Sequence, residues 1–164
     1  MLVNVLVTSR LDFCNCLLYS IPKYQRDKLQ RIQNTAARLV MGVKLSGHAT
    51  PILNNLHWLP VEKKIEFKIL LITYKTIHGH SADYLKPLIE MHQPSRTLRS
   101  ASRSLLCPQK NYGCRAFSFA ALKLWNSLAE DIKNAKTGIC FKNKLKTHLF
   151  RKAFFFSKHY GELI

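Results

Sequence analysis

The chain has 164 residues, of which 47% are hydrophobic and 21% are charged, a composition that is typical of a folded globular protein and argues against wholesale disorder. The charge balance is unusual, because 26 lysines and arginines accompany only nine acidic residues and give a net charge of +17. Such a molecule repels itself unless it meets a polyanion, so nucleic acid is the leading class of partner, with an anionic membrane surface or a ribosome-like assembly as alternatives.

The first part of the chain predicts two helices. Residues 2–19 are mostly apolar and predict a buried helix that Pro22 closes. The following segment predicts an amphipathic helix that ends near Gly42, with an apolar line at steps of three and four residues: Leu29, Ile32, Ala36, Leu39 and Val43. The outward side of this helix carries Arg31 and Arg38 beside Asp27, either as solvated surface or as a clamp for phosphate.

A long helix is predicted from Pro60 to Gly79, preceded by a short one over residues 50–55. The long helix is apolar on two opposite faces, so only the ridges between them should be in contact with solvent. One ridge holds Lys64, Lys68 and Lys75, and the ridge across from it holds Glu62, Glu66 and Thr73. The lysine ridge either keeps a buried helix solvated or contacts a phosphate backbone.

After a further helix over residues 82–90, the segment 92–115 forms a basic loop without acidic residues. Its Pro, Ser and Gly content argues against a continuous helix, and it leaves room for one short β element at residues 105–107. Guanidinium groups interleaved with hydroxyl side chains suit phosphate oxygens. The candidate contacts are Arg96, Arg99, Arg103, Lys110 and Arg115. A solvated or phosphorylatable linker is the alternative.

Two more helices are predicted towards the end of the chain, one through Trp125 and a last one capped by Thr137. The last helix has an inner apolar side and an outer side crowded with basic residues. On the basic side, Lys142 and Lys146 are candidate phosphate contacts. The inner side consists of Phe141, Leu145, Leu149 and Phe156. A basic helix rich in phenylalanine is also typical of membrane-surface elements. Exposed aromatic residues could stack on bases, but helical spacing favours a core position for Tyr24, Trp58, Tyr74 and Trp125.

The sequence contains no motif that indicates catalysis. The five cysteines form an odd set, have no zinc-site spacing and follow no secretory signal, which predicts reduced thiols and an intracellular location, in the nucleus or the cytoplasm. No pair of acidic residues suggests an acid/base dyad, and no glycine-rich phosphate loop or metalloprotease motif is present. We expect no catalytic residues, no metal, no cofactor and no membrane span.

The order of several segments resembles a known family. From about residue 5 to residue 155, the chain is similar to the C-terminal region of reverse transcriptases from LINE-type, non-LTR retrotransposons of the jockey-like kind. The segments that carry the resemblance, in order, are SRLDFCNCLLYSIP, KLQRIQNTAARLVMG, TPILNNLHWLPVEKKIEFKILLITYKTIHG, DYLKPLI, PSRTLRS, YGCRAFSFAALKLWNSL and FKNKLKTHLFRKAF. The chain departs from the family at Leu122 and Ala129, where the family has prolines, and at Cys114, where it has a polar residue.

The resemblance implies a mainly α fold, a compact multi-helix bundle with three regions. Residues 1–91 would be a thumb-like helical region that holds a template–primer duplex, 92–115 the basic loop, and 116–164 a C-terminal helical region packed on the first. The polymerase palm and fingers, with their metal-binding aspartates, have no counterpart in the sequence, and Asp83-Tyr84 is not their motif. Met1 falls inside what resembles the first thumb helix, so we expect a fragment that cannot polymerise alone.

These observations lead to one main hypothesis and two alternatives. The chain is expected to be a non-catalytic fragment of an RNA-directed DNA polymerase that binds RNA or DNA backbone without sequence specificity and partners the missing palm and fingers. The first alternative is a helical protein-interaction module whose basic surface meets an acidic partner. The second is a remnant of a transposable element without a function.

Overall fold

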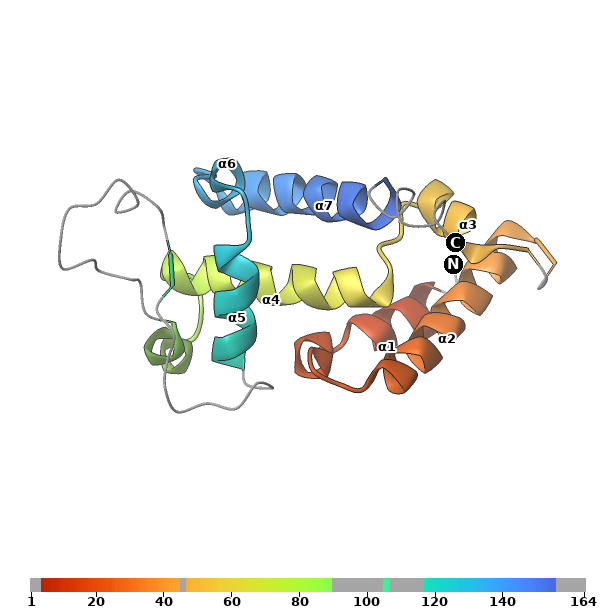
Figure 1. Cartoon of the computed structure of the whole chain (residues 1–164), viewed down its shortest axis with the longest axis horizontal. Coiled ribbons are helices and arrows are strands. Elements are labelled where there is room, and N and C mark those ends of the chain that lie inside the picture. The colour runs from red at the N-terminus through yellow and green to blue at the C-terminus, as the bar shows by residue number, and fades with distance from the viewer. Residues whose placement is uncertain (1–3, 45–46, 90–104, 107–116, 156–164) are drawn as a thin grey trace, which may run out of the picture. The chain divides into compact units, whose positions relative to one another are not determined.

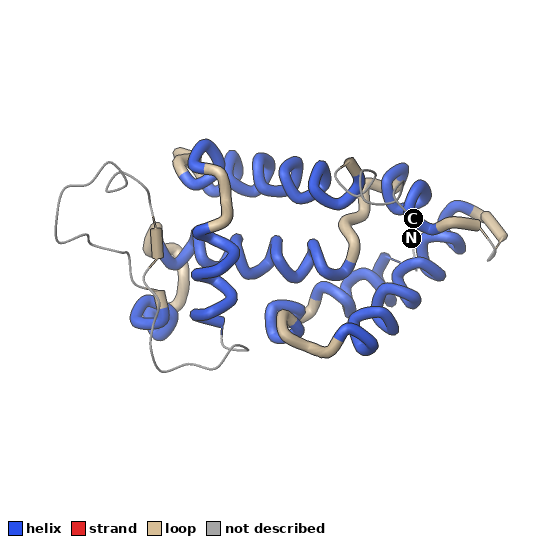
Figure 2. Tube along the Cα trace, in the orientation of Figure 1, coloured by secondary structure: helices blue, strands red, loops and turns tan. Residues whose placement is uncertain are grey.

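The computed structural model describes residues 4–44, 47–89, 105–106 and 117–155, and these residues are mainly α-helical, as predicted (Figure 1). Figure 2 shows helices joined by loops, with no strand in these ranges. The elements in chain order are η1 (Asn4–Thr8), α1 (Ser9–Asp12), η2 (Asn15–Leu18), α2 (Lys23–Met41), α3 (Ala49–Asn55), α4 (Val61–Ile77), η3 (Asp83–Leu88), α5 (Phe117–Asn126), α6 (Glu130–Lys133) and α7 (Gly138–Phe154).

The chain divides into two compact units. Unit 1 comprises Met1–Ile65 and Thr147–Ile164, and unit 2 comprises Glu66–Lys146. Unit 1 therefore draws residues from both sides of the predicted basic loop, and both α4 and α7 pass from one unit into the other. The predicted division into three regions at residues 91 and 116 stays a prediction.

The predicted buried helix over residues 2–19 is wrong in both its continuity and its burial. Cys14 has a φ of 47°, in the left-handed region, so the helical run stops at Asp12 and resumes as a short 3-10 turn at Asn15. The polar Asn15 takes the buried position, while Phe13 and Leu17 are 77% and 79% exposed. Apolar composition leads to burial only where a surface covers it, and within the described residues nothing covers these side chains.

Helix α2 has the predicted length, but a different face points inward. Gly42, with a φ of 64°, ends the helix as expected. The buried positions are Gln33, Ala36 and Ala37, whereas Ile32 and Leu39 are 51% and 68% exposed. Ala37 joins Ile52 and Leu53 of α3 and Phe154 of α7 in the core of unit 1, because its small side chain lets α3 lie close to α2 (Figure 1).

Two glutamines of α2 hold the start of α4 in unit 1. Gln33 Nε2 donates to the carbonyl of Leu59 at 2.9 Å, and its Oε1 accepts from Gln30 Nε2 at 3.0 Å. Gln30 Oε1 in turn accepts the backbone N–H of Val61 at 2.9 Å. That N–H is one of the donors that a helix start leaves without an intrahelical partner, so the glutamine pair positions and caps α4.

Replacing Gln33 by alanine is expected to lower the free energy of unfolding by about 2 kcal/mol, because the buried carbonyl of Leu59 loses its partner and a void remains. Gln25→Ala, at an exposed position of the same helix, is the control and should change it by no more than about 0.5 kcal/mol. Urea denaturation of both variants measures the difference. Equal stabilities would mean that the glutamine pair does not anchor the start of α4.

Helix α4 confirms the predicted bounds, with Pro60 before it and Gly79, at a φ of 72°, after it. Val61, Ile65 and Ile69 are buried on one face, and Leu70 and Tyr74 are buried on the other. The prediction that both ridges are solvated is wrong for one of them, because Glu66 and Thr73 are buried. The Thr73 hydroxyl has its hydrogen-bond partner within the helix, because it donates to the carbonyl of Ile69 at 2.9 Å.

Unit 2 is organised around stacked rings. Tyr74 of α4 stacks on Phe141 of α7 with ring centroids 4.1 Å apart, and Trp125 of α5 lies at 6.1 Å from the same phenylalanine. The Tyr74 hydroxyl donates to the carbonyl of Ala135 at 2.9 Å. Phe141, Leu145 and Leu149 are buried, which confirms the predicted inner side of α7 for these residues, while Phe156 lies outside the described residues.

The region of the predicted β element is described only at Leu105 and Leu106, of which Leu106 forms an isolated β-bridge and neither lies in an extended strand. The side-chain amide of Asn126 pairs with both backbone groups of Leu106. Its Oδ1 accepts the N–H at 2.9 Å, and its Nδ2 donates to the carbonyl at 3.2 Å. This Asn side chain at the end of α5 thus provides the pairing that a neighbouring strand would give.

Candidate nucleic-acid interface

Four of the predicted phosphate contacts are exposed lysines of unit 2: Lys68, Lys75, Lys142 and Lys146. Lys68 and Lys75 lie two turns apart on α4, about 10 Å along the axis, on the same side of the helix. Lys142 and Lys146 lie one turn apart on α7, about 6 Å along its axis. Each pair therefore forms a short row of ammonium groups.

The two rows belong to helices that pack against each other. The stacked rings of Tyr74 and Phe141 join α4 to α7 within unit 2. The cap of α7 also forms as predicted, since Thr137 Oγ1 accepts the N–H of Cys140 at 3.2 Å. Because Phe141 and Leu145 point inward, the neighbouring positions Lys142 and Lys146 are directed towards solvent.

No ion pair among the described residues involves these four lysines. Two other lysines of unit 2 do form ion pairs: Lys86 binds Asp83 at 2.8 Å, and Lys133 binds Glu130 at 2.9 Å. The Lys86 ammonium lowers the pKa of the Asp83 carboxyl through a hydrogen bond and charge attraction. Helix α7 itself contains no acidic residue. The two rows are thus available to an external polyanion.

The structure places two other predicted contacts in internal interactions of unit 1. Lys64 Nζ lies 3.0 Å from a carboxylate oxygen of Asp12, and its side chain is only 13% exposed. Arg38 donates to the carbonyl of Gly47 through Nε at 3.1 Å and Nη2 at 2.8 Å. Both groups hold segments of the fold together, which leaves them less free for phosphate. Arg31, by contrast, is exposed on α2.

The predicted contacts of the basic loop lie outside the described residues. They are Arg96, Arg99, Arg103, Lys110 and Arg115.

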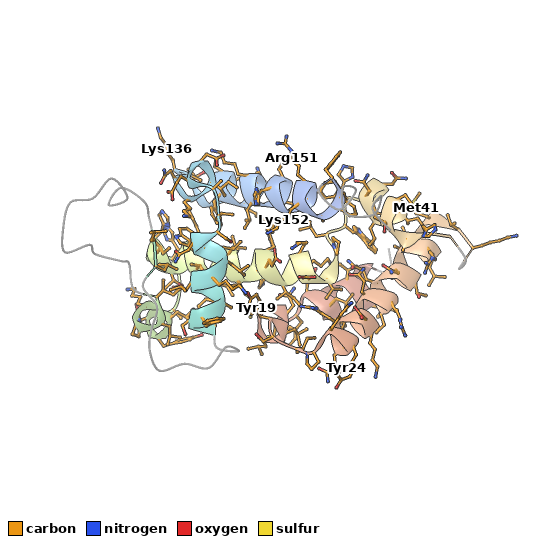
Figure 3. The ribbon with its side chains drawn as sticks, in the orientation of Figure 1. Tyr19, Tyr24, Met41, Lys136, Arg151 and Lys152 are labelled. Atoms are coloured by element: carbon orange, nitrogen blue, oxygen red, sulfur yellow. The ribbon has the colours of Figure 1, made fainter. Side chains whose placement is uncertain are left out.

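Several exposed groups were not among the predicted contacts. Arg151 and Lys152 are exposed on the last turns of α7, and Figure 3 shows Arg151 projecting from the helix. Tyr24 is exposed on α2, with the ammonium of Lys28 at 5.8 Å from its ring centre. The spacing of Tyr24 and Lys28, one helical turn, was the only signal in the sequence for this pair.

Of the aromatic residues considered for base stacking, Tyr74 and Trp125 are buried, which confirms the core interpretation for both. Trp58 is partly buried beside the core of unit 1. Tyr24 is the exception and points outward from α2 (Figure 3).

No group of three or more His, Cys, Asp and Glu side chains in the described ranges could hold a metal ion. Cys14, Cys16 and Cys140 are free thiols. None of the helices, within the part of the chain that the structure describes, has the length and apolar character needed to cross a bilayer.

Comparisons with protein-family models, with curated proteins and with solved structures gave no match to this chain.

Proposed function

We propose that the chain binds the sugar–phosphate backbone of RNA or DNA without sequence specificity. The chain would derive from the C-terminal region of a LINE-type reverse transcriptase, and it would have no catalytic activity of its own. The observation that carries the proposal is the pair of exposed lysine rows, Lys68–Lys75 and Lys142–Lys146, on two packed helices of one unit. Ammonium groups of this kind contact phosphates, which carry no base information, so binding would tolerate any sequence.

The charge of the whole chain supports the same partner. With a net charge of +17, the protein gains free energy when it replaces the counterions condensed on a nucleic-acid strand. The family resemblance suggests a template–primer duplex as the ligand, because a thumb presents basic helix surfaces to that duplex while its apolar faces pack inward. The palm and fingers would then be its partners in a complete polymerase.

Salt titration tests the proposal. Binding of the full chain to a mixed-sequence RNA–DNA duplex, followed by fluorescence anisotropy, should weaken steeply as salt rises. If the four lysines each contact one phosphate, the slope of log K against log salt should be negative and at least as steep as about −3.5. A slope near zero, or no binding at low salt, would contradict backbone binding.

A second candidate is a protein-interaction module, which is favoured by the exposed apolar face of α2. Ile32 and Leu39 lie two turns apart on this face, and Val43 continues it beyond the helix end, all of them exposed. Lys28 and Arg31 flank the face, so the occupant that fits is an apolar helix surface with an acidic rim. Under this function the duplex titration would give a flat slope.

A further inference from the structure

An exposed aromatic ring lies at the start of α2 in unit 1, on a surface that the two lysine rows do not use. Tyr24 is 60% exposed, and its side chain points outward from the first turn of the helix (Figure 3). Gln25 Nε2 donates to the Tyr24 hydroxyl at 3.2 Å, which restrains the ring. An exposed ring forgoes the free energy that burial would give, so its flat surface is available to a partner that stacks on it.

Positive groups lie beside this ring. The Lys28 ammonium lies over it, 5.8 Å from the ring centre, which is close to the outer limit of about 6 Å for a cation–π contact. Arg31 is exposed seven positions after Tyr24, about 10 Å along the axis and on the same side of the helix. No ion pair among the described residues uses either cation, and α2 has one acidic residue, Asp27, against five basic ones. Anionic groups next to the ring would therefore meet charged donors without displacing an internal ion pair.

The other exposed tyrosine in the described part of the chain has a different setting. Tyr84 of η3 is 73% exposed, but it follows Asp83, and the ammonium of Lys86 is bound to that carboxylate at 2.8 Å. A phosphate beside Tyr84 would meet a carboxylate and a cation that is already paired. Exposure of a ring alone therefore does not define the site at Tyr24, and the cations beside it are the distinguishing feature.

We propose that Tyr24, Lys28 and Arg31 form a site for single-stranded nucleic acid, in which an unpaired base stacks on the tyrosine ring. Lys28 and Arg31 bind the phosphates on either side of that base, because hydrogen bonds from charged donors to phosphate oxygens are short and strong. Stacking accepts any base, since each has a flat π-face, so the site has little sequence preference. The site rests on the proposed function for its class of partner, but its residues are separate from the lysine rows.

Two strands that differ only in their bases test the stacking. Fluorescence anisotropy of the full chain with a labelled oligothymidylate, and with an abasic strand of the same length, compares a backbone that carries bases with a bare one. The oligothymidylate should bind at least about fivefold more tightly, which is the lower end of what one base stacked on an aromatic side chain contributes. Both strands carry the same phosphates, so contacts to the backbone alone would give equal affinities.

Substitutions of the two exposed tyrosines identify the ring. Tyr24→Ala should lower the affinity for oligothymidylate to that for the abasic strand, whereas Tyr24→Phe keeps the ring and should retain the difference. Tyr84→Ala, the matched control, removes an exposed ring that has no unpaired cation assigned beside it and should also retain the difference.

Two results would overturn the site: equal binding of both strands by the parent, or an effect of Tyr24→Ala no larger than that of Tyr84→Ala. Equal binding would leave the backbone contacts of the proposed function intact and would leave the exposed face of α2 to a protein partner. Failure of the proposed function gives a different pattern, because binding to both strands and to the duplex would then be absent, and the site would fall with it.

Discussion

Replacing Phe141 by alanine is expected to lower the free energy of unfolding of unit 2 by about 3–5 kcal/mol. The side chain is fully buried and stacks on Tyr74, and it also lies beside Trp125. Its removal takes away the ring that joins three helices, α4, α5 and α7, and leaves a cavity that these helices cannot close without moving. The loss would be among the largest that a single substitution causes in this chain.

The measurement should report on unit 2 alone, because two compact units need not unfold together. Trp125 emission in a Trp58→Phe background during guanidinium denaturation meets this requirement. Ile139→Ala is the matched control: it shortens an apolar side chain two residues away on the same helix, but at a position that is 76% exposed. The control should stay within about 0.5 kcal/mol of the parent. If Phe141→Ala stayed equally close, the ring stack would not be the core of unit 2.

The sequence pattern predicted the long helices well, because the signals that define them are local. Periodic apolar residues and the glycines after their ends placed α2 and α4, and Thr137 placed the start of α7. The faces of these helices were harder to predict. An apolar side chain such as Leu39 and a polar one such as Gln33 exchange their expected positions because burial depends on which surface lies opposite.

In the candidate site, too, local patterns predicted exposure but not contacts between distant parts of the chain. The exposure of Lys142 and Lys146 followed from the inner side of α7, which local periodicity defines. The ion pair of Lys64, in contrast, joins it to Asp12, which lies 52 positions earlier in the chain. No spacing rule within one helix predicts a partner at that distance. Similarly, Asn126 holds Leu106, which lies 20 positions earlier in the chain, and no pattern within α5 predicts that partner.

Removing both lysine rows together is expected to weaken duplex binding by up to about a thousandfold at 0.1 M salt and to reduce the salt slope by up to about four. The variant carries Lys68→Ala, Lys75→Ala, Lys142→Ala and Lys146→Ala, all at exposed positions, so its stability should stay close to that of the parent. The physical reason is that each ammonium in contact with a phosphate releases close to one condensed counterion, and the release is favourable at low salt. Fluorescence anisotropy over a series of salt concentrations measures both effects.

A decrease of this kind could also arise simply because four positive charges are lost, so a control is needed that removes charge without removing a free contact. Lys86→Ala serves this purpose, because Lys86 is exposed but already paired with Asp83 at 2.8 Å. Each of the four row lysines should account for a slope change of up to about 0.9, whereas the Lys86 variant should change it by less than about 0.3. If loss of Lys86 lowers the slope as much per charge as loss of a row lysine, binding follows the net charge of the molecule, and the two rows on α4 and α7 are not its interface.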